Sequence, residues 1–365
     1  MSRDRFKEIL CFLRVDQKST RSARLINDKF ALPSEIWSPF VQNSQLCFTA
    51  GANITIDEQL LPCKARCKFI QCMANKPDKF GLKFWLAADL ETKYFLNGFM
   101  YMGKDEERDR TLQLGEYVVL KLMNPFLSKG RNVTTDNCFT SQRLADSLSA
   151  KGTSIVGTMR PNRRELPPIC KDTTQERFSS KVLVNGQKSL TLYRCKPKKN
   201  VCILSTLHRQ VEINNSSKKV PETVEYYNST KCGVDVLDQM SRKYTTRSAS
   251  RRWPVYIFYN LLDLAAINAW ILFRACNSSN ISRRCYILNL VNELRFSHCA
   301  TKKLPAVLPC RGEVKTNKRR QCSCCRNKTQ DLYSSCEKPT CGTCQERCVK
   351  NVYCRKCVDE TETLL

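Results

Sequence analysis

The sequence predicts a mixed α/β protein that ends in a small, metal-stabilised module. Three observations support this fold class. Short apolar strands alternate with amphipathic helices between residues 53 and 158. A second run of strands follows at residues 181–206, and nine of the 23 cysteines fall between Cys322 and Cys357. A chain of 365 residues is long enough for two or three domains.

The composition indicates a polyanionic partner. Lys and Arg number 61 against 34 Asp and Glu, which gives a formal net charge of +27. Apolar residues make up 42% of the chain, and this share excludes wholesale disorder. A charge of this size and sign suits either nucleic acid or an anionic membrane surface.

The membrane alternative is disfavoured by the most apolar segment, residues 254–275. It contains Asn260, Asp263 and Asn268, so we predict a buried amphipathic helix rather than a membrane span. The N-terminal sequence MSRDRFKEIL lacks the apolar centre of a signal peptide. We therefore expect a nonsecreted protein that binds nucleic acid and no membrane.

The first 57 residues predict helices followed by a strand. Phe6, Ile9 and Leu13 recur at helical spacing, and a second amphipathic stretch covers residues 33–48. The first helix is expected to start at Met1 without a capping residue. Alternating apolar residues at 53–57 then predict a short strand that carries Asp57 at its end.

The next hundred residues predict a hairpin at 81–89 and 94–101, a helix at 114–127, a strand at 132–135, a helix at 141–150 and a strand at 154–158. With Asp57 on the first strand and Asp136 directly after the fourth, this is the layout of an RNase H-like domain. Residues 161–168 interrupt the pattern, and the strands at 181–206 turn at Asn185-Gly186. We predict a compact β-rich insertion here, rather than a continuation of the first sheet. Helices resume near Gly233 and at residues 254–275.

Separated carboxylates are the first candidate chemistry: Asp57, Asp136, Asp235 and Asp238. Clustered carboxylates hold Mg²⁺ ions in two-metal phosphoryl transfer. Asp57 and Asp136 would be close if their strands are neighbours, and Asp235 and Asp238 would share one helix face. The alternative is that these residues form turns and helix caps.

The second candidate is a zinc module built from four cysteine pairs. A segment under 40 residues long with this many thiols suits two closed Zn²⁺ sites, ligated in a RING-like cross-brace that joins the first pair to the third and the second to the fourth. Cys324 could replace Cys325 as a ligand. The pairs are Cys322 with Cys325, Cys336 with Cys341, Cys344 with Cys348, and Cys354 with Cys357.

The third candidate is a basic stretch, RKYTTRSASRRW, at residues 242–253. Its cations suit a DNA backbone, and its aromatic residues could stack on an unpaired base. The alternative is a solvated loop in which the tryptophan anchors the next helix. The candidate nucleic-acid-binding residues are Arg242, Lys243, Arg247, Arg251, Arg252 and Trp253.

Six long segments resemble the piggyBac transposase family: NITIDEQLLPCKARCKF, NKPDKFGLKFWLAAD, GRNVTTDNCFTS, SIVGTMRPNRRELP, YYNSTKCGVDVLDQM and RRWPVYIFYNLLDLAAINA. The resemblance implies an RNase H-like catalytic core and a cysteine-rich domain that binds two Zn²⁺ and recognises the transposon end. It also implies excision through hairpinned ends, integration at TTAA, a homodimer and a nuclear location. Asp57, Asp136 and Asp235 match the family's catalytic positions, where Mg²⁺ or Mn²⁺ acts, and Asp238 matches a further acid.

The resemblance also implies domain bounds. A helical dimerisation and DNA-binding domain comprises residues 1–51 and 242–308, and the catalytic core comprises 52–161 and 222–241. The insertion is 162–221, a basic linker is 309–320, and the zinc domain is 321–358.

Three departures bear on activity. The chain begins inside the family's usual N-terminal region, so we expect a truncated form. Cys232 stands where the family usually has a glycine, and Cys348 where some relatives have a histidine. The alternatives to an active transposase are a noncatalytic, element-derived DNA- or chromatin-binding protein and an inactive remnant.

Overall fold

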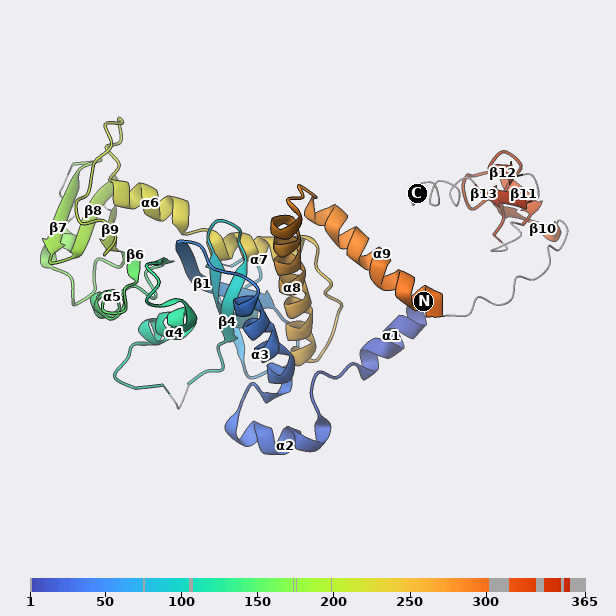
Figure 1. Cartoon of the computed structure of the whole chain (residues 1–365), viewed down its shortest axis with the longest axis horizontal. Coiled ribbons are helices and arrows are strands. Elements are labelled where there is room, and N and C mark those ends of the chain that lie inside the picture. Colours follow the sequence, from blue (N-terminus) through green and yellow to red (C-terminus); the bar gives the residue numbers. More distant parts are fainter. Residues whose placement is uncertain are drawn as a thin grey trace. The chain divides into compact units, whose positions relative to one another are not determined.

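The computed structural model describes residues 2–74, 76–104, 108–172, 174, 176–197, 199–301, 315–332, 338–348 and 351–354. The chain divides into two compact units, residues 1–289 and 290–365. The larger unit holds one sheet with helices packed against it (Figure 1).

The chain begins with three helices, α1 (Arg3–Phe12), α2 (Lys18–Asn27) and α3 (Ala31–Leu46). Ser2 caps α1, because its Oγ accepts a hydrogen bond from the Arg5 amide at 3.3 Å. The predicted uncapped start is therefore wrong, since a short polar side chain already precedes the first turn. The Trp37 indole of α3 donates a hydrogen bond to the Gly98 carbonyl at 3.0 Å, which fixes α3 on the sheet.

The core strands follow the predicted order with one addition, the short β2. Their bounds are β1 (Asn53–Pro62), β2 (Ile70–Cys72), β3 (Phe80–Asp89), β4 (Phe95–Met100), β5 (Asn132–Thr135) and β6 (Ser154–Met159). Strand β1 runs parallel to β5, β5 runs parallel to β6, and β3 is antiparallel to β1. The helices between these strands are α4 (Leu114–Met123), which continues into a 3₁₀ turn at Asn124–Phe126, and α5 (Gln142–Ser149), whose cap is Ser141.

Strand β1 is longer than predicted and carries Asp57 in its middle. The polar residues Glu58 and Gln59 break the apolar alternation, which is why the pattern ended at residue 57. The strand continues because Gln59 is buried and bonded on both sides, to Asp238 and to Asn260, each at 2.9 Å. Buried polar groups with partners cost a strand little.

The insertion continues the core sheet, which corrects the prediction of a separate compact unit. Its strands are β7 (Ser180–Asn185), β8 (Lys188–Lys196) and β9 (Lys199–Ser205), preceded by a 3₁₀ turn at Pro168–Lys171. Strand β9 pairs antiparallel with β6, from Val156 opposite Ser205 to Met159 opposite Cys202. The sheet thus has nine strands in the order β2-β3-β1-β5-β6-β9-β8-β7, with β4 also on β3. Apolar patterns predict strands but not the strands they pair with. Here β9 pairs with the edge of β6 that β5 leaves open. The turn at Gly186 is as predicted, with φ +59°.

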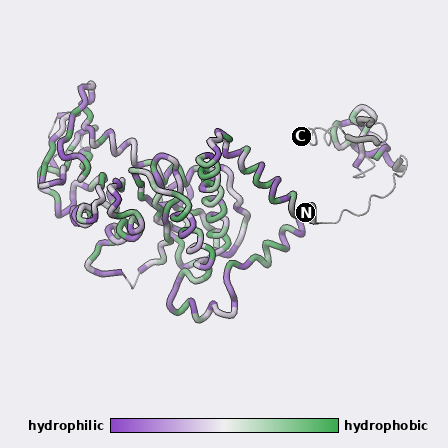
Figure 2. The backbone as a smooth tube through the Cα atoms, in the orientation of Figure 1, coloured by the Kyte–Doolittle hydropathy of each residue, from purple (hydrophilic) through white to green (hydrophobic). Residues whose placement is uncertain are grey.

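Four helices follow the insertion: α6 (Glu222–Thr230), α7 (Gly233–Lys243), α8 (Trp253–Asn277) and α9 (Arg283–Thr301). By length and composition α8 could cross a membrane, but 56% of its most apolar window is buried in the fold. Figure 2 shows its largely apolar colouring between the neighbouring segments. Asn268 accepts a hydrogen bond from the Phe95 amide at 2.8 Å and donates to the Phe95 carbonyl at 3.0 Å. The predicted buried helix is confirmed.

The smaller unit contains two antiparallel hairpins. They are formed by β10 (Lys315–Gln321) with β11 (Lys328–Asp331) and by β12 (Gln345–Cys348) with β13 (Asn351–Cys354).

Candidate carboxylate site, basic segment and cysteine centre

Parallel pairing of β1 and β5 brings the first two predicted acids together. Ile56 lies opposite Thr135, so Asp57 and Asp136 follow in neighbouring positions at one end of β5. One carboxylate oxygen from each of Asp57, Glu58 and Asp136 lies within 4.8 Å of the others. The predicted proximity of Asp57 and Asp136 is confirmed. Glu58 was missed, because strict alternation along a strand places consecutive side chains on opposite faces.

Local backbone hydrogen bonds hold both aspartates in place. Asp57 Oδ1 accepts from the Glu58 amide, and Asp136 Oδ1 accepts from the Cys138 amide, both at 2.8 Å. The Thr140 hydroxyl donates to the Asp136 carbonyl at 2.7 Å. Gly157 on β6 makes room for this turn, since a Cβ there would lie 2.2 Å from Thr140 Oγ1. Asp136 therefore lies in a turn, as the alternative interpretation proposed, and the same turn fixes its carboxylate.

The three carboxylates repel one another. Burial raises the pKa of Asp57 well above its ordinary value, and the charges of Glu58 and Asp136 raise it further. Burial likewise raises the pKa of Asp136, with Glu58 adding to the effect. Glu58 Oε2 is buried and has no hydrogen-bond partner among the described residues. Buried oxygen ligands of this kind fit a hard divalent cation such as Mg²⁺, which would offset the repulsion.

Asp235 and Asp238 lie on α7, outside that group of three. Asp235 is 62% exposed and pairs with Lys76 at 3.5 Å. The Lys76 ammonium also donates to the Glu58 carbonyl at 3.3 Å, so a single cation connects α7 to β1. Asp238 receives hydrogen bonds from Gln59 at 2.9 Å and from Arg242 at 3.0 Å. Of the four predicted acids, the structure brings two together and pairs the other two with cations.

The first turn of α7 lies against β1 where Gly233 meets the Thr55 side chain. A Cβ at Gly233 would lie 2.5 Å from Thr55 Oγ1 and 2.8 Å from Thr55 Cβ. Gly233 therefore has no space for a side chain. Thr55 in turn donates to the Thr230 carbonyl at 2.8 Å, which joins the end of α6 to the same strand.

Tyr227 on α6 faces the acids and was also missed by the sequence analysis. Its hydroxyl lies 3.4 Å from Thr158 Oγ1. Burial raises the Tyr227 pKa, and the charges of Asp136, Asp57 and Asp235 raise it further. The signal available in the sequence was its position in the YYNSTKCGVD segment, eight residues before Asp235.

The basic segment at 242–253 divides into residues that hold the fold and residues that face solvent. Arg242 bonds Asp78 at 2.9 Å as well as Asp238, and Arg252 donates to the Leu13 and Leu10 carbonyls at 2.6 and 2.7 Å. The Trp253 ring packs on Phe69 with the ring centroids 5.6 Å apart, as the anchoring alternative proposed. Lys243, Arg247 and Arg251 are exposed.

The cysteine module groups four thiols in a single centre, Cys322, Cys325, Cys341 and Cys344, whose sulfur atoms lie within 4.8 Å of one another. Cys325 and Cys341 are 3.6 Å apart, close to the roughly 3.8 Å edge of a tetrahedral ZnS₄ site with Zn–S bonds of about 2.3 Å. The predicted grouping is corrected, because Cys341 pairs with Cys344 across two residues instead of with Cys336. The exposed Cys324 does not replace Cys325. Cys336 and Cys357 lie outside the described residues, and only the backbone of Cys348 and Cys354 is described.

Hydrogen bonds favour a thiolate within this group. Burial acts to raise the pKa of Cys341, but hydrogen bonds from Cys325 and from the Cys344 amide lower it to about 6. The Cys322 sulfur accepts from the amides of Cys341 and Cys324 at 3.3 and 3.4 Å. Four convergent thiols of this kind fit a closed structural zinc site.

The comparisons with known proteins agree with these features. The family described as Transposase IS4, a piggyBac-type transposase family, matches residues 1–270. Human PiggyBac transposable element-derived protein 3 is 24% identical over 292 residues, which are 75% of this chain and 48% of that protein. Human PiggyBac transposable element-derived protein 2 is 24% identical over 229 residues, which are 56% of this chain and 38% of that protein. The chain thus spans less than half the length of these two relatives.

A solved structure matches nearly the whole chain. It is the cryo-EM structure of the piggyBac transposase synaptic complex with hairpin DNA, with a TM-score of 0.76 and 33% sequence identity. The match covers 98% of this chain and 80% of that one. From the family match over residues 1–270 and this likeness, the chain belongs to the piggyBac-type transposase family.

Proposed function

We propose that the chain is a DDD-type DNA transposase with an RNase H-like core, which cleaves and transfers DNA strands at TTAA sites in a metal-dependent reaction. The observation that carries this proposal is the group Asp57, Glu58 and Asp136, with a buried Glu58 oxygen that has no partner among the described residues. The parallel β1-β5-β6 arrangement, with β3 antiparallel, supports the RNase H-like assignment.

Mg²⁺ or Mn²⁺ is the proposed cofactor of this site, held by Asp57, Asp136 and Glu58. When bound, such ions supply Lewis-acid activation of the nucleophile and stabilisation of the leaving oxygen. The chain's own residues orient the carboxylates for this chemistry. The Glu58 and Cys138 amides orient the two aspartates, and Lys76 holds Asp235 beside β1. Asp235 is the third proposed acid of the set, and Asp238 positions β1 through Gln59.

Double-stranded DNA, as transposon ends and TTAA target, is the proposed partner. The net charge of +27 and the exposed Lys243, Arg247 and Arg251 support phosphate contacts. The solved relative is, by its description, a complex with hairpin DNA. We also propose that Cys336, Cys348, Cys354 and Cys357 form a second Zn²⁺ site, that the protein acts in the nucleus, and that it forms a homodimer. The exposed apolar side chains Phe6, Ile9 and Phe12 on α1 support a partner for that helix.

A noncatalytic DNA- or chromatin-binding role is the second candidate. It is favoured by the pairing of Asp235 with Lys76 and of Asp238 with Arg242, which leaves two matched acids outside the group of three. The two human relatives are named as element-derived proteins. This alternative includes an inactive remnant that keeps the fold.

Strand cleavage by matched variants distinguishes these functions. We expect Asp57→Asn and Asp136→Asn to abolish Mg²⁺- or Mn²⁺-dependent nicking of a duplex that carries a terminal repeat beside TTAA, while DNA binding persists. The control is Asp146→Asn, an aspartate on α5 that pairs with Lys188 at 2.6 Å and lies outside the acidic group. Equal nicking by the parent and Asp57→Asn would rule out the site. DNA binding without nicking by the parent would support the noncatalytic role.

A further inference from the structure

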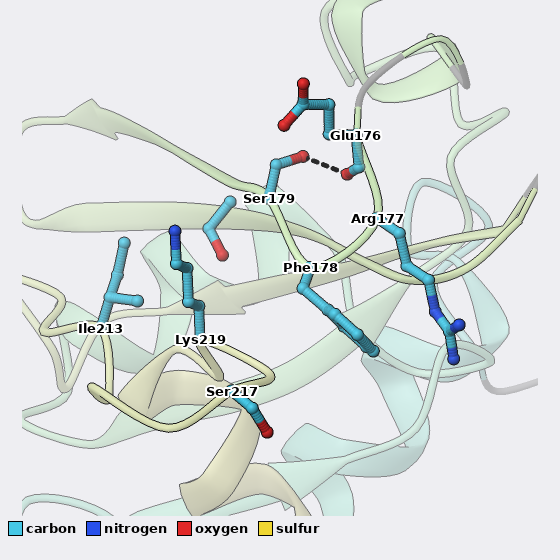
Figure 3. Close-up of a pocket in the computed structure, with 8 residues that line it drawn as sticks. Glu176, Arg177, Phe178, Ser179, Ile213, Ser217 and Lys219 are labelled. Atoms are coloured by element: carbon cyan, nitrogen blue, oxygen red, sulfur yellow. Dashed lines mark hydrogen bonds between the residues drawn. The ribbon is translucent and has the colours of Figure 1, made fainter.

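The insertion contains a pocket of about 420 Å³ that is separate from the carboxylate site. This volume is within the range of small-ligand pockets, about 300–1,000 Å³. Figure 3 shows it between the segment that enters β7 and the loop before α6. The residues on which its chemistry depends are Glu176, Phe178, Ser179, Ser180, Ser217 and Lys219.

The backbone on both sides of the pocket is held in an unfavourable conformation. Phe178 has φ +66° and Lys219 has φ +44°, and they are two of the five residues other than glycine with positive φ among those described. Such strain persists only where the surroundings fix it, and it clusters at ligand sites. Here the Phe178 amide donates to the Arg194 carbonyl at 2.8 Å, and the Tyr193 hydroxyl donates to the Lys218 carbonyl at 2.7 Å. The pocket walls are therefore fixed before any ligand arrives.

The polar groups in the pocket lack partners that their chemistry requires. Ser180 Oγ is buried without a hydrogen bond, and the Lys219 ammonium has no acidic partner within ion-pair distance, in both cases counting only described residues. Figure 3 shows the Lys219 side chain extending into the pocket, whereas Ser179 bonds back to the Glu176 carbonyl at 2.6 Å. Among the described residues, the unpaired Lys219 ammonium and the unpaired Ser180 hydroxyl form a donor set for an oxyanion.

The charge around the pocket favours the same ligand. Residues 171–219 contain eleven Lys and Arg against three Asp and Glu. The Glu176 carboxylate is the one acid among the lining residues, and it opposes an anion. Glu176 thus provides a control of opposite sign to Lys219.

We propose that this pocket binds a phosphoryl group, supplied by the backbone of DNA bound to the same chain. The DNA source rests on the proposed DNA-binding function. Lys219 supplies the charge, and the Ser180 hydroxyl donates a hydrogen bond to a phosphate oxygen. Arg177, the other cation of the lining, stacks its guanidinium on the Phe178 ring, 4.5 Å from the centroid. Contacts of this type set the position of a duplex without reading its sequence.

The test compares Lys219→Met with Lys218→Met in the full chain. The two variants lose the same charge one residue apart, but Lys218 does not line the pocket. Affinity for a duplex is measured against salt concentration, and binding of inorganic phosphate is measured separately by calorimetry. We expect Lys219→Met to lower the slope of log K against log salt by about 0.9, the value for one phosphate contact. It should also abolish phosphate binding. Lys218→Met should keep phosphate binding, Ser180→Ala should weaken it, and Glu176→Gln should strengthen it.

The outcomes separate this proposal from the proposed function. Loss of phosphate binding in Lys219→Met with an unchanged DNA slope would keep the anion site but assign it to a free phosphate. No phosphate binding by the parent, or equal effects of the two lysine variants, would overturn the pocket. If the parent fails to bind DNA, DNA binding is refuted, and the phosphate measurement still decides whether the site exists.

Discussion

Asp57 carries the largest electrostatic cost among the acids of the candidate site. Its pKa is raised by burial and by two neighbouring carboxylates, so its ionised form is disfavoured in the folded chain. A carboxyl whose folded pKa lies above its unfolded value contributes stability at low pH, and that contribution is lost as pH rises through the folded value. The pKa of Asp136 is also raised, so its ionisation acts in the same direction. Ionisation near neutral pH therefore destabilises the metal-free protein at this site.

Asp57→Asn should consequently stabilise the metal-free chain at pH 7. The melting temperature should rise by about 2–4 °C for each kcal/mol of repulsion relieved in a unit of this size. The gain should vanish at acidic pH, where the parent carboxyl is protonated, and Mg²⁺ should raise the melting temperature of the parent more than that of the variant. Differential scanning calorimetry across pH, with and without Mg²⁺, measures this. A lower melting temperature for the variant at pH 7 would contradict the assignment.

The arginines of the basic segment should separate into two classes. Arg247→Ala combined with Arg251→Ala should flatten the salt dependence of DNA binding and leave the melting temperature nearly unchanged, since both side chains are exposed. Arg242→Ala and Arg252→Ala should instead destabilise the fold by about 1–3 kcal/mol, because the part-buried carbonyls of Leu60 and Leu10 each lose an arginine donor. Urea unfolding and binding titrations measure the two effects. Identical behaviour of the double variant and the two single variants would refute the division.

At the scale of elements, the contact between α7 and β1 decides where Asp235 and Asp238 lie. The helix begins at Gly233, directly against Thr55. Spacing along the sequence could place both acids on one helix, but hydrophobic periodicity does not predict that the helix backbone approaches the Thr55 side chain of β1 this closely. Gly233 is the residue in the sequence that permits this contact.

Gly233→Ala should therefore shift α7 away from β1. A Cβ at 2.5 Å from Thr55 Oγ1 has no room, and overpacking of this kind costs about 1–3 kcal/mol. We expect a lower melting temperature and weaker cleavage. The matched control is Cys232→Ala, one residue earlier, where a Cβ is already present. If Gly233→Ala melts like Cys232→Ala, the close contact is not required.

The sequence predicted the strands and turns that carry the candidate acids, but it did not predict which strands pair with one another. Asp57 and Asp136 were predicted from their strands, and the parallel register confirmed their proximity. Glu58 was missed because alternation assigns it to the other face. The pairing of β9 with β6 was missed because the residue pattern that predicts a strand does not indicate which strand it pairs with. In the cysteine module, spacing alone could not choose Cys344 over Cys336 as the neighbour of Cys341.

At the scale of the whole molecule, the chain is two units with different sources of stability. Residues 1–289 enclose a large apolar core, whereas the cysteine module has four convergent thiols and two short hairpins. Small units built around clustered thiols depend on metal for their fold. Their responses to chelation should differ accordingly.

Zinc removal should unfold the cysteine module and leave the sheet intact. Metal analysis of the purified chain should return about two Zn²⁺ per molecule if both predicted S₄ sites form. After chelation, hydrogen exchange should become fast in β10–β11 and remain slow in β1, β5 and β6. Alkylation by a thiol reagent should increase at Cys322 and Cys341, which are buried in the folded chain. Slow exchange in β10–β11 after complete zinc removal would refute a metal-dependent fold.

The pairing of β9 with β6 also constrains how this protein could have evolved. An insertion that forms its own sheet can be gained or lost as a unit, since its removal leaves the host strands paired. Here, deletion of residues 162–221 would expose the backbone edge of β6 from Val156 to Met159, in the middle of the nine-stranded sheet. Unprotected edges of this kind recruit other chains and cause aggregation. Changes at the outer strand β7 should therefore be tolerated, whereas loss of β9 should make the core aggregate.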